Sequence, residues 1–261
     1  MRYFIELSYN GRNFHGWQSQ PNAESVQSVI EYSLSKVFRK TIPITGAGRT
    51  DAGVNARQMY AHFDLDSGID SNNEREVLKS LNSLVGKDIY INRIFKVKED
   101  AHARFDATKR TYKYFITFSK NPFLKDICWL SPSALDYDLM NIAAQSLLQT
   151  KDFTSFAKLH SDVKTNICSV GEALWKPLKE DKDALNFLGC LDNGLVFTIS
   201  ADRFLRNMVR AIVGTLVDVG RHKITSKDFS NIILKKNRCS AGTSMPGNAL
   251  FLWEIEYPYK I

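Results

Sequence analysis

Apolar and polar residues follow two different periods along the first half of the chain. Residues 3–9 alternate with a period of two, which predicts a half-buried strand. Apolar residues at helical spacing predict an amphipathic helix over 24–39. The same patterns predict strands at 41–45, 59–65 and 89–97 and a second helix at 77–85. The first half therefore reads as β-α-β-β-α-β.

The second half begins in the same way, with an alternating strand at 112–118 and a helix at 135–147. Asp192-Asn193-Gly194 has the residues of a hairpin turn. This turn would join two of three predicted strands, which lie at 166–178, 184–190 and 195–200. Helices at 204–219 and 227–236 and a last strand at 249–257 follow. The order of the first half thus returns with an added hairpin strand and helix.

This repetition predicts an α+β fold made of two similar split β-α-β units, of the ferredoxin-like or RRM-like kind. The units are expected to join into one continuous mixed, largely antiparallel sheet with helices on one face and the other face free for a ligand. No low-complexity linker divides the two halves. We place the boundary near Phe105, which gives domains at 1–104 and 105–261. The two halves are expected to share a central cleft.

Composition adds a charge bias to this picture. The chain has 261 residues, 44% of them hydrophobic, which is enough for a sizeable core. The 35 Lys and Arg against 28 Asp and Glu give a net charge of +7, which favours polyanionic partners, although a merely basic protein has the same charge. The four cysteines are far apart and predict free thiols and no metal site. No apolar run reaches membrane-spanning length, so we expect no membrane partner and a cytoplasmic protein.

The most informative segment is the glycine-rich loop at 46–54, Gly-Ala-Gly-Arg-Thr-Asp-Ala-Gly-Val. It lacks the Lys-Ser or Lys-Thr pair of a phosphate-binding P-loop. An ordinary connection with a surface ion pair between Arg49 and Asp51 is one interpretation. In a partly desolvated cleft, however, a neighbouring Arg keeps an Asp ionised and able to attack an electrophilic carbon. Asp51 is therefore a candidate nucleophile, and it acts without the second carboxylate of a glycosidase.

Residues 48–54 of this loop resemble the signature loop of the tRNA pseudouridine synthase A family. Other blocks resemble that family in the same order, so that the similarity spans nearly the whole chain. They are Phe14-His15-Gly16-Trp17-Gln18 with Val26-Gln27, His102-Ala103-Arg104-Phe105, Arg110-Thr111-Tyr112-Lys113-Tyr114, Asp152-Phe153-Thr154-Ser155-Phe156, and Phe204-Leu205 with Met208-Val209-Arg210.

The resemblance implies an isomerase that converts uridine to pseudouridine in the anticodon stem-loop of tRNA, among tRNA positions 38 to 40, without cofactor or metal. It implies that Asp51 attacks either C6 of the base or C1′ of the sugar. The target nucleotide must be flipped out of its stack, and Tyr112 resembles the tyrosine that supports it, although Tyr114 shares its strand face. Arg49, Thr50 and Arg210 are expected to bind substrate, with Arg210 holding either Asp51 or a phosphate. Family members act as homodimers on one tRNA.

Other residues qualify this prediction. Arg203, Arg206, Asn207 and Arg210 would form a basic stripe on the helix at 204–219, either solvated or in contact with phosphates. Asn55 and Arg206 depart from the family pattern, as does the segment 245–249, so uridine specificity could be narrower. His15, His62 and His102 are read as structural or RNA-contacting. A noncatalytic RNA-binding or RNA-chaperone protein is the alternative function, but it would not need the loop 49–51 together with Tyr112.

Overall fold

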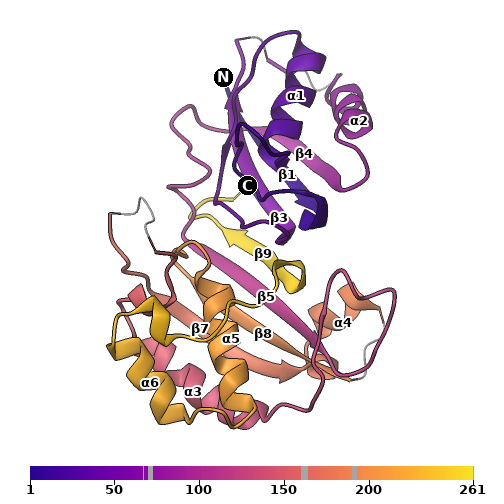
Figure 1. Ribbon diagram of the computed structural model, residues 1–261. Helices are drawn as coiled ribbons and strands as arrows, with labels where there is room; N and C mark the ends of the chain where they lie inside the picture. The colour runs from indigo at the N-terminus through magenta and orange to yellow at the C-terminus, as the bar shows by residue number, and fades with distance from the viewer. Residues whose placement is uncertain (67, 70–72, 160–163, 190–192, 261) are drawn as a thin grey trace. The chain divides into compact units, whose positions relative to one another are not determined.

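The computed structural model (Figure 1) describes residues 1–66, 68–69, 73–159, 164–189 and 193–260. The chain divides into two compact units, unit 1 with Met1–Thr108 and Leu252–Ile261, and unit 2 with Lys109–Phe251. Within the described residues, nine strands belong to one mixed sheet and six α-helices accompany them, which confirms the predicted α+β class. None of the helices in this described part is both long and apolar enough to cross a membrane.

Unit 1 is built on three antiparallel strands in the order β4-β1-β3. Strand β1 pairs with both β3 and β4, and the short β2 pairs with β3. In Figure 1 the two helices of unit 1 lie on the same side of these strands. The elements are β1 (Arg2–Tyr9), α1 (Val26–Phe38), β2 (Thr45–Gly46), β3 (Asn55–Asp64), α2 (Glu74–Leu84) and β4 (Ile89–Lys96), with a short 3-10 helix η1 at Gly11–Asn13.

The helices of unit 1 begin and end where their local chemistry dictates. Ser25 and Ser28 form a reciprocal capping box at the start of α1. Val26, Ile30 and Leu34 recur at intervals of four and are fully buried, so they anchor α1 by its apolar face. Arg39 ends α1 in the left-handed conformation. The helix predicted over 24–39 is therefore confirmed, with Ser25 as its N-cap.

Unit 2 has the antiparallel strand order β5-β8-β7, with β6 parallel to β5. Helix α3 packs on β7 and against α5 and α6. The elements are β5 (Lys109–Thr117), β6 (Trp129–Leu130), α3 (Tyr137–Gln149), β7 (Val170–Pro177), α4 (Lys182–Leu188), β8 (Gly194–Ala201), α5 (Met208–Gly220) and α6 (Ser226–Leu234), with 3-10 helices η2 (Thr154–Phe156), η3 (Leu178–Glu180), η4 (Arg238–Ser240) and η5 (Gly247–Ala249). Strand β9 (Leu250–Glu256) starts in unit 2 and ends in unit 1.

The strand predicted at 184–190 was wrong, because this segment contains helix α4. Asp181 caps the helix by accepting a hydrogen bond from the backbone N–H of Ala184 at 2.9 Å. The hairpin predicted between this segment and β8 is therefore absent, and residues 190–192 of its turn lie outside the described residues. Phe187 of α4 stacks on Phe115 of β5 at 6.4 Å between ring centroids.

The helix predicted at 204–219 begins four residues later, at Met208. Asn207 precedes it with φ of 66°, a left-handed conformation that interrupts the helix. Arg203, Arg206 and Asn207 therefore do not lie on the helix, and the basic stripe predicted at helical spacing was wrong. Arg210 is the one member of that stripe within α5.

Candidate active site

The loop that carries Asp51 joins β2 to β3 in unit 1. At its start, the backbone N–H of Ala47 donates to the carbonyl of Tyr60 at 2.8 Å, which extends the β2–β3 pairing. At its end, the N–H of Val54 donates to the carbonyl of Asp51 at 3.1 Å, and Gly53 between them has φ of 77°. Asp51 therefore opens a tight turn that only a residue tolerant of positive φ can complete.

The segment 14–17 holds this loop through main-chain contacts. The N–H of Trp17 donates to the carbonyl of Thr50 at 3.2 Å, and the N–H of Gly53 donates to the carbonyl of Phe14 at 3.3 Å. These bonds lie on either side of Asp51. Gly16 has φ of 92°, and a Cβ at this position would lie 2.4 Å from the carbonyl oxygen of Thr50. The close approach of the two segments thus requires glycine at position 16.

Thr50 is fixed from inside the protein. Its side-chain hydroxyl lies 2.8 Å from the hydroxyl of Tyr9, and both residues are buried. Tyr9 in turn packs against the Trp17 ring at 6.3 Å between centroids. Trp17 is only 2% exposed, and a Cβ on Gly46 would lie 2.4 Å from its indole ring. The indole is therefore packed in the core, and Thr50 holds the loop to strand β1.

Asp51 and Arg49 have different surroundings from Thr50. Asp51 is half-buried and Arg49 is exposed. Among the residues that the structure describes, Arg49 forms neither a hydrogen bond nor an ion pair. The surface ion pair between Arg49 and Asp51 that an ordinary loop would have is thus absent there. The guanidinium of Arg49 projects from a loop whose backbone is held in place.

Asn55, one of the departures from the family pattern, has a structural role. It is 1% exposed, and its Oδ1 accepts a hydrogen bond from the backbone N–H of Gly11 at 2.8 Å. A Cβ on Gly11 would lie 2.0 Å from the carbonyl oxygen of Val54. The amide of Asn55 therefore fixes the end of the Asp51 loop to η1. Sequence alone gave no sign of this buried contact.

In unit 2, Tyr112 and Tyr114 lie two residues apart on β5, but their environments differ. Tyr114 is fully buried, and its hydroxyl donates to the carbonyl of Pro246 at 3.3 Å. Burial raises the pKa of the Tyr114 hydroxyl far above its ordinary value. Tyr112 is 9% exposed and meets the ring of Phe204 edge to face, with 5.1 Å between centroids. Of the two, Tyr112 therefore keeps some access to solvent.

Arg210 lies in the first turn of α5 and joins it to the segment before β9. Its Nε donates to the carbonyl of Met245 at 2.6 Å, and the N–H of Met245 donates to the carbonyl of Arg210 at 3.1 Å. Nearby, the hydroxyl of Ser244 accepts hydrogen bonds from Asn207 at 2.6 Å and from Arg238 at 2.7 Å. The segment that departs from the family pattern is thus tied firmly to Arg210.

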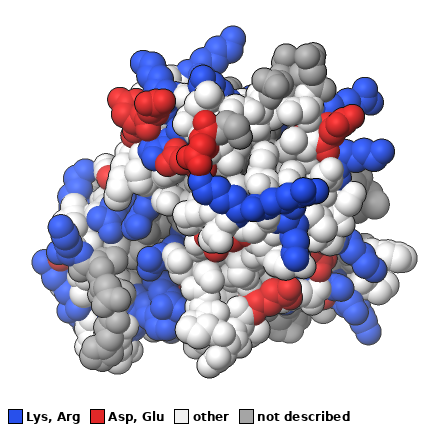
Figure 2. Space-filling model, turned by 90° about the horizontal axis from the view of Figure 1, so that it is seen from above, with Lys and Arg blue, Asp and Glu red and all other residues white. Residues whose placement is uncertain are grey.

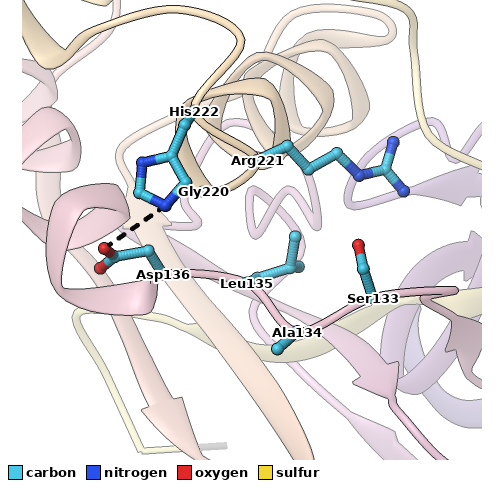
Figure 3. Close-up of a pocket in the computed structure, with 7 residues that line it drawn as sticks. All are labelled: Ser133, Ala134, Leu135, Asp136, Gly220, Arg221 and His222. Atoms are coloured by element: carbon cyan, nitrogen blue, oxygen red, sulfur yellow. Dashed lines mark ion pairs between the residues drawn. The ribbon is translucent and has the colours of Figure 1, made fainter.

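A cavity of about 420 Å³ lies elsewhere in unit 2 (Figure 3). Its lining contains none of the predicted site residues. His222 and Asp136 face each other across it, with 3.8 Å between Nε2 and Oδ2. Gly220 lies at the opposite end of α5 from Arg210, about 15 Å along the helix at 1.5 Å per residue. The lining residues are Ser133, Ala134, Leu135, Asp136, Gly220, Arg221 and His222.

Comparison with known proteins shows to which family the chain belongs. The sequence matches the model of the tRNA pseudouridine synthases over residues 7–106 and 143–258. The chain belongs to the tRNA pseudouridine synthase family. Asp51 and the segment 14–17 lie within the first matched range of this synthase family and Arg210 within the second, whereas Tyr112 lies between them.

Individual members of the synthase family resemble the chain over its whole length. A protein of Bacteroides thetaiotaomicron called tRNA pseudouridine synthase A is 52% identical over 260 residues, covering 100% of this chain and 92% of that protein. The proteins of the same name from Bacteroides fragilis and Parabacteroides distasonis are 51% and 50% identical over 260 residues. These alignments cover 100% of this chain and 98% and 97% of the two relatives.

Proposed function

We propose that this chain isomerises uridine to pseudouridine in tRNA, with Asp51 as the catalytic carboxylate. Family membership supports the reaction. The assignment of Asp51 rests on one observation: hydrogen bonds with the segment 14–17 fix the backbone on both sides of a half-buried carboxylate. A nucleophile must be held close to its target in a fixed geometry, and this loop provides such a support.

In the proposed reaction, the carboxylate of Asp51 attacks either C6 of the uracil or C1′ of the ribose, and the bond between N1 and C1′ breaks. The uracil then turns, a bond forms between C5 and C1′, and the bond between Asp51 and the substrate breaks, which restores the carboxylate. The hydrogen on C5 leaves as a proton, and N1 gains a proton. The nucleotide must first leave its stack, and Tyr112 would support the flipped base. Arg49, Thr50 and Arg210 would bind the substrate or position the loop.

The substrate we propose is the anticodon stem-loop, with targets among tRNA positions 38 to 40. The net charge of +7 favours an RNA backbone. Figure 2 shows Lys and Arg side chains spread over one face, with several of them forming a continuous run. Because tRNA is a cytoplasmic molecule, the proposed site of action is the cytoplasm.

Tritium release from C5-labelled uridine in unmodified tRNA transcripts tests the proposal. The native protein should release tritium, and product mapping should place the modified uridine in the anticodon arm. Asp51→Asn, which keeps the shape of the side chain, should release none, while Asp66→Asn controls for the loss of one exposed carboxylate. Equal release by the Asp51 variant would refute the catalytic assignment. Binding of tRNA without release by the native protein would favour the noncatalytic RNA-binding function.

We further propose that the protein acts as a homodimer, since one chain of 261 residues has limited reach along an L-shaped tRNA. Size-exclusion chromatography with light scattering at micromolar concentration should give a mass near twice 29.7 kDa. A mass of one chain, with full activity at the same concentration, would contradict this proposal.

A further inference from the structure

Hydrogen bonds with several other segments of unit 1 hold the turn at 101–106 in place. Ala103 is fully buried, and its N–H donates to Nδ1 of His62 at 3.2 Å. Its carbonyl accepts a hydrogen bond from the hydroxyl of Tyr257 at 2.6 Å. On one side of it, Arg2 donates to the carbonyl of Ala101 at 3.0 Å. The base of this turn is therefore fixed by side chains from three other segments.

Two side chains close the tip of the same turn. Nδ1 of His102 accepts hydrogen bonds from the N–H groups of Arg104 and Phe105, at 3.1 and 3.2 Å. The carboxylate of Asp106 accepts from the N–H of His102 at 2.8 Å and from the hydroxyl of Tyr259 at 2.8 Å. Since Nδ1 accepts in both bonds, the imidazole needs no proton there, and burial lowers the pKa of His102 in the same direction.

This scaffold presents an aromatic ring to solvent. Phe105 is 75% exposed, although its ring contacts His102 in a tilted arrangement with 4.2 Å between centroids, and His102 meets His62 at 4.6 Å. The guanidinium of Arg104 lies 5.8 Å from the centre of the Phe105 ring. These contacts therefore leave most of Phe105 accessible to solvent. The backbone N–H of Phe105 is one of the groups that fix its position.

We propose that Phe105, with Arg104 beside it, is a stacking site for an unpaired nucleobase of the substrate tRNA, distinct from the flipped target uridine. An exposed ring that is already ordered loses little conformational freedom when a base stacks on it. Base-to-aromatic stacking contributes about tenfold or more in affinity per base and accepts any base. The neighbouring guanidinium suits the phosphate that accompanies each base. This inference rests on the proposed function, because it takes tRNA as the substrate.

Variants of Phe105 test the inference, with Phe123→Ala as the matched control. Phe123 is another exposed phenylalanine, at 91%, in unit 2. Phe105→Ala should raise the Kd for unmodified tRNA and the KM for pseudouridine formation by about tenfold to a hundredfold. The rate in single turnover at saturating tRNA should stay near the native value. Phe123→Ala should change neither.

Two more variants separate stacking from mere apolar contact. Phe105→Trp should restore tRNA affinity, and Phe105→Leu should behave like Phe105→Ala, because leucine has no planar π face. Thermal unfolding of all three should match the native protein, since the side chain is exposed. Equal Kd values for Phe105→Ala and Phe123→Ala would overturn the inference, as would a change in molecular mass that marks Phe105 as a protein contact. If the native protein binds tRNA through Phe105 but forms no pseudouridine, the stacking site stands and the proposed function fails.

Discussion

Replacing Gly16 with alanine tests whether the segment 14–17 supports Asp51. Two costs can be worked out from the structure. The φ of 92° at Gly16 disfavours any residue with a Cβ by about 1–2 kcal/mol. The new methyl group would lie 2.4 Å from the Thr50 carbonyl oxygen and 3.1 Å from the Asp51 carbonyl carbon. Both neighbours are backbone atoms, so relief requires a shift of the chain, which costs about 1–3 kcal/mol.

The sum, about 2–5 kcal/mol, is a large share of the about 5–15 kcal/mol that stabilises an ordinary domain. The remaining folded protein should also be less active, because displacing a nucleophile by about 1 Å costs roughly a hundredfold in rate. Gly86→Ala is the matched control: Gly86 has φ of 76°, but no atom lies within 4 Å of the added Cβ. It should lose only the conformational part and keep its rate.

The assay is urea unfolding for stability, with single-turnover tritium release under conditions in which both variants remain folded. The free energy of unfolding should fall by at least 1 kcal/mol more for Gly16→Ala than for Gly86→Ala, about the lower limit of the packing cost. If the two variants unfold alike, the contact between Gly16 and Thr50 is not tight. If Gly16→Ala is less stable but fully active, the segment 14–17 does not position Asp51.

Three further predictions concern buried polar groups. Tyr9→Phe leaves the buried Thr50 hydroxyl without its partner and should reduce the free energy of unfolding by about 1–3 kcal/mol, whereas Tyr9→Phe combined with Thr50→Val should recover part of this loss in urea titrations. Lys113→Met leaves the Asp181 carboxylate, 12% exposed, without its ion pair and should cost about 3–5 kcal/mol. Adding Asp181→Leu should restore part of this stability, because it removes the buried charge but also the cap of α4, and no recovery would argue against a desolvation cost. Burial lowers the pKa of His62 to about 4, so protonation opposes folding, and stability should fall by up to about 3 kcal/mol between pH 6.5 and 4. The melting temperature of His62→Gln should fall less than that of the native protein between pH 6.5 and 4. If the melting temperatures of both proteins fall equally over this range, other groups cause the effect.

The lysine–aspartate pair adds its own pH dependence with a different range. Burial alone would raise the pKa of Asp181, but the hydrogen bonds from Lys113 and Ala184 outweigh it, so the pKa is lowered. A carboxylate with a lowered pKa stabilises the fold above its unfolded value of about 3.9 and loses that contribution as the pH falls through its folded value. Loss from Asp181 therefore begins near the pH at which loss from His62 ends.

Much of the fold could be predicted from hydrophobic periodicity, and the failures have local physical causes. The segment 184–190 is short and rich in apolar residues, a pattern that a strand and a buried helix share. The N-cap at Asp181 and the stacking of Phe187 on Phe115 stabilise the helix. At 204–207 the apolar spacing continued without a break, but the left-handed Asn207 delayed the helix start. Such single-residue conformations leave no trace in a hydrophobic pattern.

The candidate site shows a similar division. The loop residues Arg49, Thr50 and Asp51 are adjacent in sequence, so a motif could identify them together. Their supports could not be found this way, because Tyr9 and Gly16 lie about thirty or more residues before the loop and contact it only after folding. Thr50 was expected to bind substrate, a role that stays a prediction, and the structure shows its hydroxyl paired with Tyr9 inside the protein.

The two neighbours Arg49 and Thr50 show how one loop can be held in place and still expose a side chain to solvent. Thr50 is buried and tied to Tyr9, while Arg49 is exposed and makes no ion pair with the residues that the structure describes. The backbone between β2 and β3 is thus ordered without a ligand. If Arg49 binds RNA as proposed, immobilising its exposed side chain costs about 0.5–1.5 kcal/mol. Binding energy from RNA is then free to act on the nucleotide and need not order the loop.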